Sequence, residues 1–495
     1  MAGVSFSELL RQRSGERFAL HERLLNGQLV RVLRTIGFDR HYVSAQGQYL
    51  FDGDGNRYLD LLSGFGVFGI GRNHPAVKRA IVETLDADLP NLVQMDVSVL
   101  SGLLAEKLSA LLPGLDKFFF CSSGAEAVEA AIKFARFATR RARLIHCEHA
   151  FHGLTYGALS LNGGAEFRDG FGPLLLDCVA VPFNDLAALE RALSSREAAA
   201  FVVEPIQGKG VNLPCDDYLR AAAALCRKYG TLFIADEIQT GMGRTGRFAA
   251  IEHWGVEADM VLLAKGLSGG FVPVGAVAMK KWIFDRLFDR MDRAMTHGST
   301  FSKTDLAMAA GLATLAVMED ENLVARAGAQ GTAIMADLAA LRVKHPLIKE
   351  VRGKGMMIGI EFCAPDSFKH RGAWWLLDQL EKGLYCQTVI VPLFTRHRIL
   401  TQVAGHGLPV IKLLPPYMVS DEDRVWIRDA FDEVLTGCQN VTASVLGLMR
   451  DMAKGATRGM ARFNRPVQPD ELVAAPYRAR GHAPNKGKPP PTLVP

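Results

Sequence analysis

The chain has 495 residues, of which 49% are hydrophobic and 22% are charged. This is the composition of a globular protein with room for two or more domains. The net charge of +5 is small for this length and gives no general signal for nucleic-acid binding. The eight cysteines form no CxxC pair and lack the dense spacing of a disulfide scaffold, so we expect reduced thiols and a cytoplasmic location.

The predicted elements begin with a hairpin at residues 49–64, where a DGDG turn separates two apolar runs. A Gly-rich segment follows it. We assign residues 1–75 as an N-terminal segment that contributes to a small domain.

Short apolar runs then alternate with amphipathic stretches. The runs are predicted as strands at 117–122, 142–147, 176–183, 199–205, 231–237, 258–265 and 274–280. Because residues 126–141 have helical spacing, the intervening stretches are predicted as helices, and the fold as α/β with a mostly parallel sheet. The link before 274–280 is too short for a crossover helix, so that strand is predicted to be antiparallel. These elements define a large domain at 76–325.

Helices and short strands alternate again further on and predict a smaller α/β domain at 326–440. Residues 441–464 are predicted as a basic amphipathic helix. Its part at 444–463 either packs on its own domain or makes a weak contact with an anionic membrane surface. The tail at 465–495 is rich in proline, lysine and arginine and is predicted to be disordered.

Two charged residues close predicted buried strands, Asp236 in TLFIADE and Lys265 in ADMVLLAK. Ligands of parallel sheets collect at this edge. A partly desolvated lysine is a candidate Schiff-base nucleophile, and a carboxylate can keep the pyridinium nitrogen of pyridoxal phosphate protonated. Taken singly, a lysine that reaches solvent and an aspartate that caps a turn are the simpler interpretation.

A candidate phosphate site lies in CSSGAEAVEAAIKFAR, where a strand, a small polar loop and a helix follow one another. The backbone N–H groups of Ser123, Gly124 and Ala125 would point at an anion on the helix dipole. A simple N-cap is the alternative.

Two other motifs are set aside. GMGRTG at 241–246 is followed by no helix pattern, so it is interpreted as a loop and not a dinucleotide site. In HCEHAFH the residues that end the strand alternate between faces, so no metal site is expected.

Four motifs together make the sequence resemble the class III aminotransferases, pyridoxal-phosphate enzymes of fold type I. They are FVVEPIQG, ADEIQTGMGRTG, the lysine that ends VLLAK, and HGSTF. The resemblance runs from about residue 49 to residue 436. It implies a homodimer, because Thr300 of HGSTF would reach the cofactor phosphate of the neighbouring subunit.

The same resemblance implies roles around the cofactor ring. Lys265 would bind the cofactor and move the proton, while Asp236 would pair with the pyridine nitrogen. Gln239 would bond the 3-hydroxyl, and Phe151 and Ile238 would lie on either face of the ring.

On the substrate side, the resemblance places Arg352 of VRGKG at the donor α-carboxylate. Glu204 of EPIQG would pair with this arginine when no acidic substrate is bound. A permanent structural ion pair is the alternative. Leu154 stands where many relatives have an arginine that meets a second carboxylate. Phe65 and its neighbours would form an apolar entrance.

These residues predict a transaminase that moves an amino group from glutamate or another amino acid to an aldehyde or keto acceptor, long or apolar in character. RILTQVAGH and VIKLLPP are similar to the aminotransferases that act on bacterial hopanoid lipids. The alternatives are an aminomutase or racemase of the same fold, and an aminotransferase of the ornithine, acetylornithine or 4-aminobutyrate type. A third alternative is a binding protein that keeps this fold but has no catalytic activity.

Overall fold

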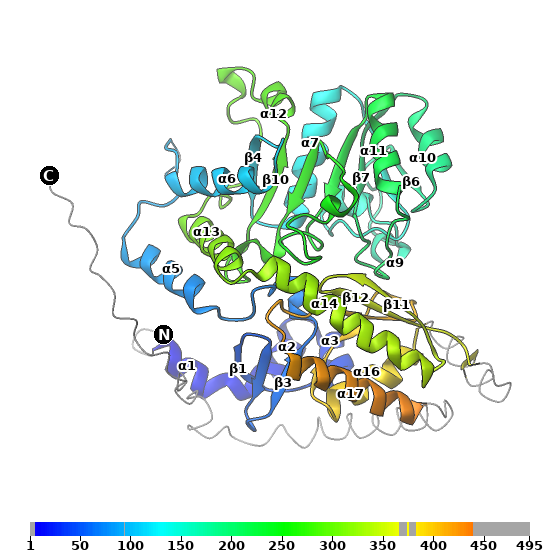
Figure 1. Ribbon diagram of the computed structural model, residues 1–495. Helices are drawn as coiled ribbons and strands as arrows, with labels where there is room; N and C mark the ends of the chain where they lie inside the picture. Colours follow the sequence, from blue (N-terminus) through cyan, green and yellow to red (C-terminus); the bar gives the residue numbers. More distant parts are fainter. Residues whose placement is uncertain (1–4, 94, 366–373, 376–382, 439–495) are drawn as a thin grey trace, which may run out of the picture.

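The computed structural model describes residues 5–93, 95–365, 374–375 and 383–438 (Figure 1). Its largest sheet is built from β4 (Lys117–Cys121), β5 (Arg143–Cys147), β6 (Cys178–Val181), β7 (Ala198–Val203), β8 (Leu232–Asp236), β9 (Met260–Leu263) and β10 (Gly275–Met279). The strand order in this 7-stranded sheet is β4-β10-β9-β8-β7-β5-β6. β10 runs antiparallel to both of its neighbours, and the other pairs are parallel. The predicted strands, and the reversed direction of the last one, are confirmed.

Both faces of this sheet are covered by helices. In β8, Ile234 faces the apolar cluster under α7 (Gly124–Thr139), while Phe233 and Ala235 face the main core on the other side. Alanines on the buried side of α7 let the helix lie close to the strands. The other helices of this part are α5 (Pro75–Asp86), α6 (Val99–Leu111), α8 (Tyr156–Ser160), α9 (Ala165–Arg168), α10 (Leu186–Leu193), α11 (Tyr218–Tyr229), α12 (Lys281–Leu287) and α13 (Asp305–Asp320).

Two smaller sheets lie below the large one in Figure 1. One contains β1 (Tyr42–Gln46), β2 (Tyr49–Asp52), β3 (Arg57–Asp60) and β13 (Ile399–Leu400). β2 and β3 are the arms of the predicted hairpin, and β3 pairs in parallel with β13. The other sheet contains β11 (Ile348–Lys354), β12 (Met357–Phe362), β14 (Gln402–Val403) and β15 (Val410–Leu413). The sheet with β13 therefore joins residues 42–60 to residues 399–400, which are far away in the sequence.

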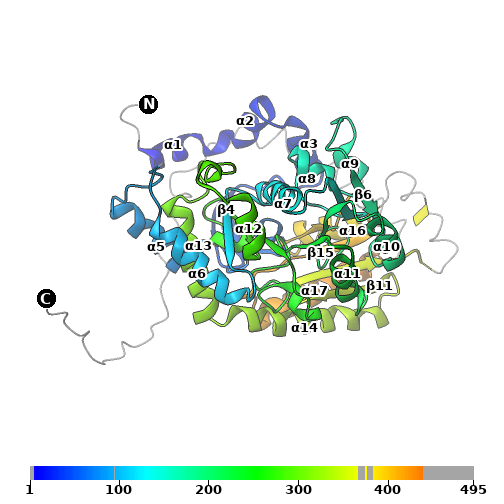
Figure 2. The same ribbon diagram turned by 90° about the horizontal axis from the view of Figure 1, so that it is seen from above.

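Helices α14 (Leu323–Ala340), α16 (Tyr385–Thr395) and α17 (Asp421–Cys438) cover these smaller sheets. At the start of the chain, α1 (Phe6–Arg13), α2 (Arg17–Leu24) and α3 (Gly27–Thr35) follow one another along one edge of the molecule (Figure 2). α4 (Ser63–Gly66) is a short turn between β3 and α5. None of the described helices has the length and apolar character needed to cross a bilayer.

The domain bounds given above stay a prediction. The helix expected at 441–464 and the tail at 465–495 lie outside the described residues.

Candidate active site at the strand ends of the large sheet

The candidate site lies where the parallel strands of the large sheet end. Asp236 is the last residue of β8, Glu204 directly follows β7, and Lys265 lies just beyond β9. Asp236 and Glu204 are only 3% and 6% exposed. The fold thus gathers two carboxylates and an amine at one buried edge, which is where α/β sheets bind their ligands.

Lys265 has the properties of a nucleophilic amine. Its backbone φ of +42° lies in the left-handed region, which is strained for a residue with a side chain and is typical of functional positions. Burial lowers the pKa of Lys265, although the charges of Asp236 and Glu204 oppose this effect. Within the described residues its amine has no hydrogen-bond partner. The amine is therefore free to react with a carbonyl group.

Asp236 is held by His152, the last histidine of HCEHAFH. His152 Nδ1 lies 2.7 Å from one carboxylate oxygen of Asp236, and the other oxygen accepts the N–H of Ile238 at 3.1 Å. Burial lowers the pKa of His152, but the hydrogen bond and the charge of Asp236 outweigh it and raise the pKa above its ordinary value. His152 thus orients Asp236. Its position directly after Phe151 is the signal that could have revealed it.

The loop before α7 forms the predicted anion cradle. Ser123 is the N-cap, and its hydroxyl accepts the N–H of Glu126 at 3.1 Å. The N–H groups of Gly124 and Ala125 have no partner in the part of the chain that the structure describes. A Cβ at position 124 would lie 3.0 Å from Ile238 Cδ1, so the glycine lets Ile238 pack against the start of the helix. The cradle can accept a phosphate.

The residues at this edge fit pyridoxal phosphate, because each part of the cofactor has a chemical counterpart. The cradle suits its phosphate, Asp236 its pyridinium nitrogen, and Lys265 its carbonyl carbon. Ile238 lies beside the cradle, and the N–H of Phe151 donates to Glu204 at 3.0 Å. The roles of these two side chains against the ring stay predictions.

Gln239 was expected to bond the cofactor ring. In the structure its side-chain amide donates to the backbone oxygen of Phe65 at 3.0 Å. Phe65 itself has a φ of +61° and is 52% exposed, and its role as an entrance residue stays a prediction.

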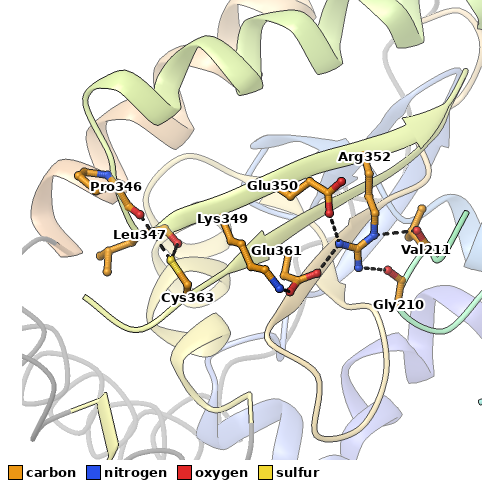
Figure 3. Close-up of polar contacts among 9 residues, drawn as sticks. All are labelled: Gly210, Val211, Pro346, Leu347, Lys349, Glu350, Arg352, Glu361 and Cys363. Atoms are coloured by element: carbon orange, nitrogen blue, oxygen red, sulfur yellow. Dashed lines mark hydrogen bonds and ion pairs between the residues drawn. The ribbon is translucent and has the colours of Figure 1, made fainter. Parts of the chain in front are cut away.

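Arg352 is not placed as the sequence suggested, because the structure does not pair it with Glu204. Its guanidinium forms ion pairs with Glu350 and Glu361, and it donates to the backbone oxygens of Gly210 at 2.7 Å and Val211 at 2.9 Å (Figure 3). Glu350 and Glu361 lie in β11 and β12, next to Arg352 in the same sheet. Neither the expected switch nor a permanent ion pair between Arg352 and Glu204 is formed in this structure, and the role of Arg352 at a donor carboxylate stays a prediction.

The cation near Glu204 is Lys412, in the middle of β15. Its ammonium donates to the backbone oxygen of Gly208 at 2.8 Å and lies 3.4 Å from the Gln239 side-chain oxygen. The N–H of Gly208 in turn donates to Glu204 at 2.8 Å. Burial lowers the pKa of Lys412 to about 8, and the charge of Lys265 adds to this effect. Sequence reasoning missed Lys412, although a lysine inside the apolar run VIKLLPP is a signal for a buried amine.

If Arg352 is structural, Arg352→Gln will lower the free energy of unfolding by about 2 kcal/mol, because Glu361 will lose its buried partner. The side chains of Arg352 and Glu361 are 13% and 17% exposed. The KM for amino donors will stay unchanged. Urea denaturation and steady-state kinetics measure the two effects, and Lys349→Met, which removes a more exposed partner of Glu361, is the matched control. A tenfold rise in KM at unchanged stability would contradict this assignment.

Thr300 lies in a loop that packs against the start of α7. The hydroxyl of Ser299 donates to Glu126 at 3.0 Å, and the N–H of Ser122 donates to the same carboxylate at 2.8 Å. Thr300 is exposed and lines a cavity of about 1100 Å³. Met291 and Met295, which also line this cavity, are 98% and 77% exposed.

Comparisons with known proteins agree with this geometry. The family model described as aminotransferase class-III matches residues 36–435. Aminotransferase PigE of Serratia sp. (strain ATCC 39006) is 33% identical over an alignment of 433 residues. The match covers 81% of this chain and about half (51%) of that relative's length. The acetylornithine aminotransferase of Bacillus cereus (strain ATCC 14579) is 38% identical over 399 residues, covering 79% of this chain and 92% of the relative.

A solved structure of the ornithine aminotransferase from Toxoplasma gondii, with partial occupancy of pyridoxal phosphate at its active site, superposes with a TM-score of 0.74. It is 29% identical, and the match covers 86% of this chain and 95% of that one. The family model matches most of the sequence. The strand-end site, with its lysine, aspartate and phosphate cradle, points to the same family. This chain belongs to the class III aminotransferases, the fold type I enzymes that use pyridoxal 5′-phosphate.

Proposed function

We propose that this protein transfers an amino group from an amino-acid donor, glutamate first among them, to an aldehyde or keto acceptor. The observation that carries the proposal is the buried strand edge where Lys265, Asp236 and the cation Lys412 meet. An amine for proton transfer, a carboxylate for a pyridinium and a cation for a substrate carboxylate are the groups that transamination needs.

Each residue has one task in this reaction. Bound pyridoxal phosphate supplies an electron sink for the carbon that loses its proton. Lys265 takes that proton from the donor and returns one to the acceptor. Asp236, oriented by His152, would pair with the pyridine nitrogen of the bound cofactor. The cradle before α7 fixes the phosphate end, so that the reacting carbon stays within reach of Lys265.

The direct test mixes the cofactor-loaded protein with single amino donors and follows both the visible absorption of the cofactor and the oxo acid released. Glutamate should change the spectrum and release one equivalent of 2-oxoglutarate. If no donor in a broad panel yields an oxo product, the proposed function is wrong. A product that keeps the amino group, with no free oxo acid, would support the aminomutase alternative.

We further propose that Lys412, in place of Arg352, receives the donor carboxylate. With its pKa at about 8, Lys412 loses its proton as the pH rises above that value. Inhibition by glutarate, which stays fully ionised over this range, should therefore weaken about tenfold per pH unit above pH 8. Lys412→Met should bind glutarate weakly at every pH, while Lys412→Arg should bind it without this pH dependence. A flat profile in the native protein would contradict the assignment.

The acceptor is proposed to be long or apolar, because exposed apolar side chains lie close in sequence to residues of the site. Phe65, Leu154 and Tyr156 are 52%, 58% and 62% exposed. A series of straight-chain aldehydes of increasing length, assayed against glutamate, tests this. A rise of kcat/KM with chain length supports it, whereas strict preference for acetylornithine or 4-aminobutyrate contradicts it. The names of the acetylornithine and ornithine aminotransferases among the relatives make that second outcome the competing candidate.

A homodimer is proposed from the exposed Thr300 and the apolar side chains around it. A second copy that covers this face would bury Met291 and Met295 and bring Thr300 to its own phosphate cradle. Sedimentation at twice the mass of one chain supports the dimer, and sedimentation as a monomer contradicts it. Location in the cytoplasm stays an expectation from the sequence.

A further inference from the structure

Lys209 is a second buried lysine close to the site, and the reaction described so far does not use it. It directly follows Gly208, whose N–H binds Glu204 and whose oxygen binds Lys412. Lys209 is 9% exposed, and its ammonium forms an ion pair with Glu166 of α9. Glu166 is its one acidic partner among the described residues.

Two aromatic contacts connect Lys209 to the cofactor side of the site. Its ammonium lies 5.3 Å from the centre of the Phe167 ring. That ring meets the Phe151 ring edge-on, with centres 5.2 Å apart and planes at 69°. On the other side, a Cβ at Gly405 would lie 3.1 Å from Lys209 Cε, so the turn before β15 closes against the lysine stem. The ammonium is therefore held next to the site and away from solvent.

The two members of the ion pair differ in how firmly they are held. The Lys209 side chain is 11% exposed, whereas that of Glu166 is 28% exposed and extends from the single turn of α9. Burial raises the pKa of Glu166, but the hydrogen bond and charge of Lys209 outweigh this and hold it below its usual range. Glu166 can turn toward water, but a buried ammonium left without an anion is costly. The pair is suited to exchange one carboxylate for another.

We propose that Lys209 is a specificity-determining residue that binds the second carboxylate of a dicarboxylic substrate, which displaces Glu166. This inference rests on the proposed transaminase function and names the substrate class of its donor side. It explains how glutamate and 2-oxoglutarate can be used although Leu154 stands where an arginine was expected. Monocarboxylic donors would leave the pair between Lys209 and Glu166 intact.

The two partners give opposite expectations, which separates this role from a structural one. Lys209→Met should raise the KM for glutamate about 30-fold or more and leave that for alanine within about twofold. Glu166→Gln removes the competing carboxylate and should lower the KM for glutamate. A purely structural ion pair would weaken both donors equally in both variants. Equal effects on the two donors, or a rise of the glutamate KM in Glu166→Gln, overturn the proposal.

A binding measurement keeps the test independent of turnover and of the folding of the Met variant. Glutarate should raise the melting temperature of the native protein more than butyrate does, and Glu166→Gln should increase this difference. Lys228→Met, in the exposed pair with Glu190, is the matched control and should change nothing. If no donor releases an oxo acid, the proposed function has failed. If glutamate reacts but the variants behave like the control, this inference alone has failed.

Discussion

Lys265→Ala should lower the rate of transamination about 10⁴-fold, because it removes the proton-transferring amine and the nucleophile at once. The phosphate cradle and Asp236 are untouched in this variant, so the cofactor should still bind, without a covalent link. Single-turnover kinetics with glutamate measure the loss. The visible spectrum should show bound cofactor before gel filtration. It should show little afterwards, because no covalent bond retains the cofactor on the protein.

The control is Lys280→Ala, which removes a lysine that pairs with Asp259 near the start of β9, at the opposite edge of the sheet. It should keep full activity. If Lys265→Ala retains activity within tenfold of the native protein, another amine moves the proton. Lys412, whose pKa of about 8 leaves part of it unprotonated, would then be the group to replace next.

Asp236→Asn should have the second-largest effect, a loss of between about 10² and 10³ in kcat. An amide has no negative charge to hold a proton on the pyridine nitrogen. It also leaves His152 without its buried anionic partner at 2.7 Å, so the pKa of His152 should fall below its present raised value. The loss should appear in kcat more than in the KM of the donor.

Asp432→Asn is the matched control for this prediction. It removes the carboxylate from another aspartate–histidine pair, in which His345 Nε2 lies 2.6 Å from Asp432, far along the chain in α17. A comparable fall in activity from both variants would mean that disturbance of the fold, and not lost charge at the strand end, explains the effect.

Lys265 and Asp236 could be predicted from sequence because each closes a strand whose apolar character and neighbours define the strand end. The same holds for the cradle at Ser123, since a strand, a loop and a helix follow one another there within a few residues. These features can be predicted because they depend only on residues that are close together in the sequence. The antiparallel direction of β10 belongs with them, because a short Gly-rich link rules out a crossover helix.

The partners of Glu204 could not be predicted in this way. Arg352 and Lys412 lie in two strands of one sheet, β11 and β15, with β12 between them. Which of the two residues faces Glu204 depends on strand register and on how that sheet meets the large one. Neither the strand register nor the way in which the two sheets meet can be predicted from a short sequence motif. His152 was missed for a different reason, because its neighbours in sequence suggested metal binding while its partner, Asp236, lies on another strand.

The pairing of β3 with β13 affects the order in which parts of the protein can fold during synthesis. Residue 59 leaves the ribosome long before its strand partner, residue 399. All strands of the large sheet, from 117 to 279, emerge before then and can pair among themselves. Until residue 399 emerges, the edge of β3 in the early hairpin has no strand partner. Lys412 reaches the site after the other site residues named here. A nascent chain therefore has its cradle and Lys265 in place before Lys412 can reach the site.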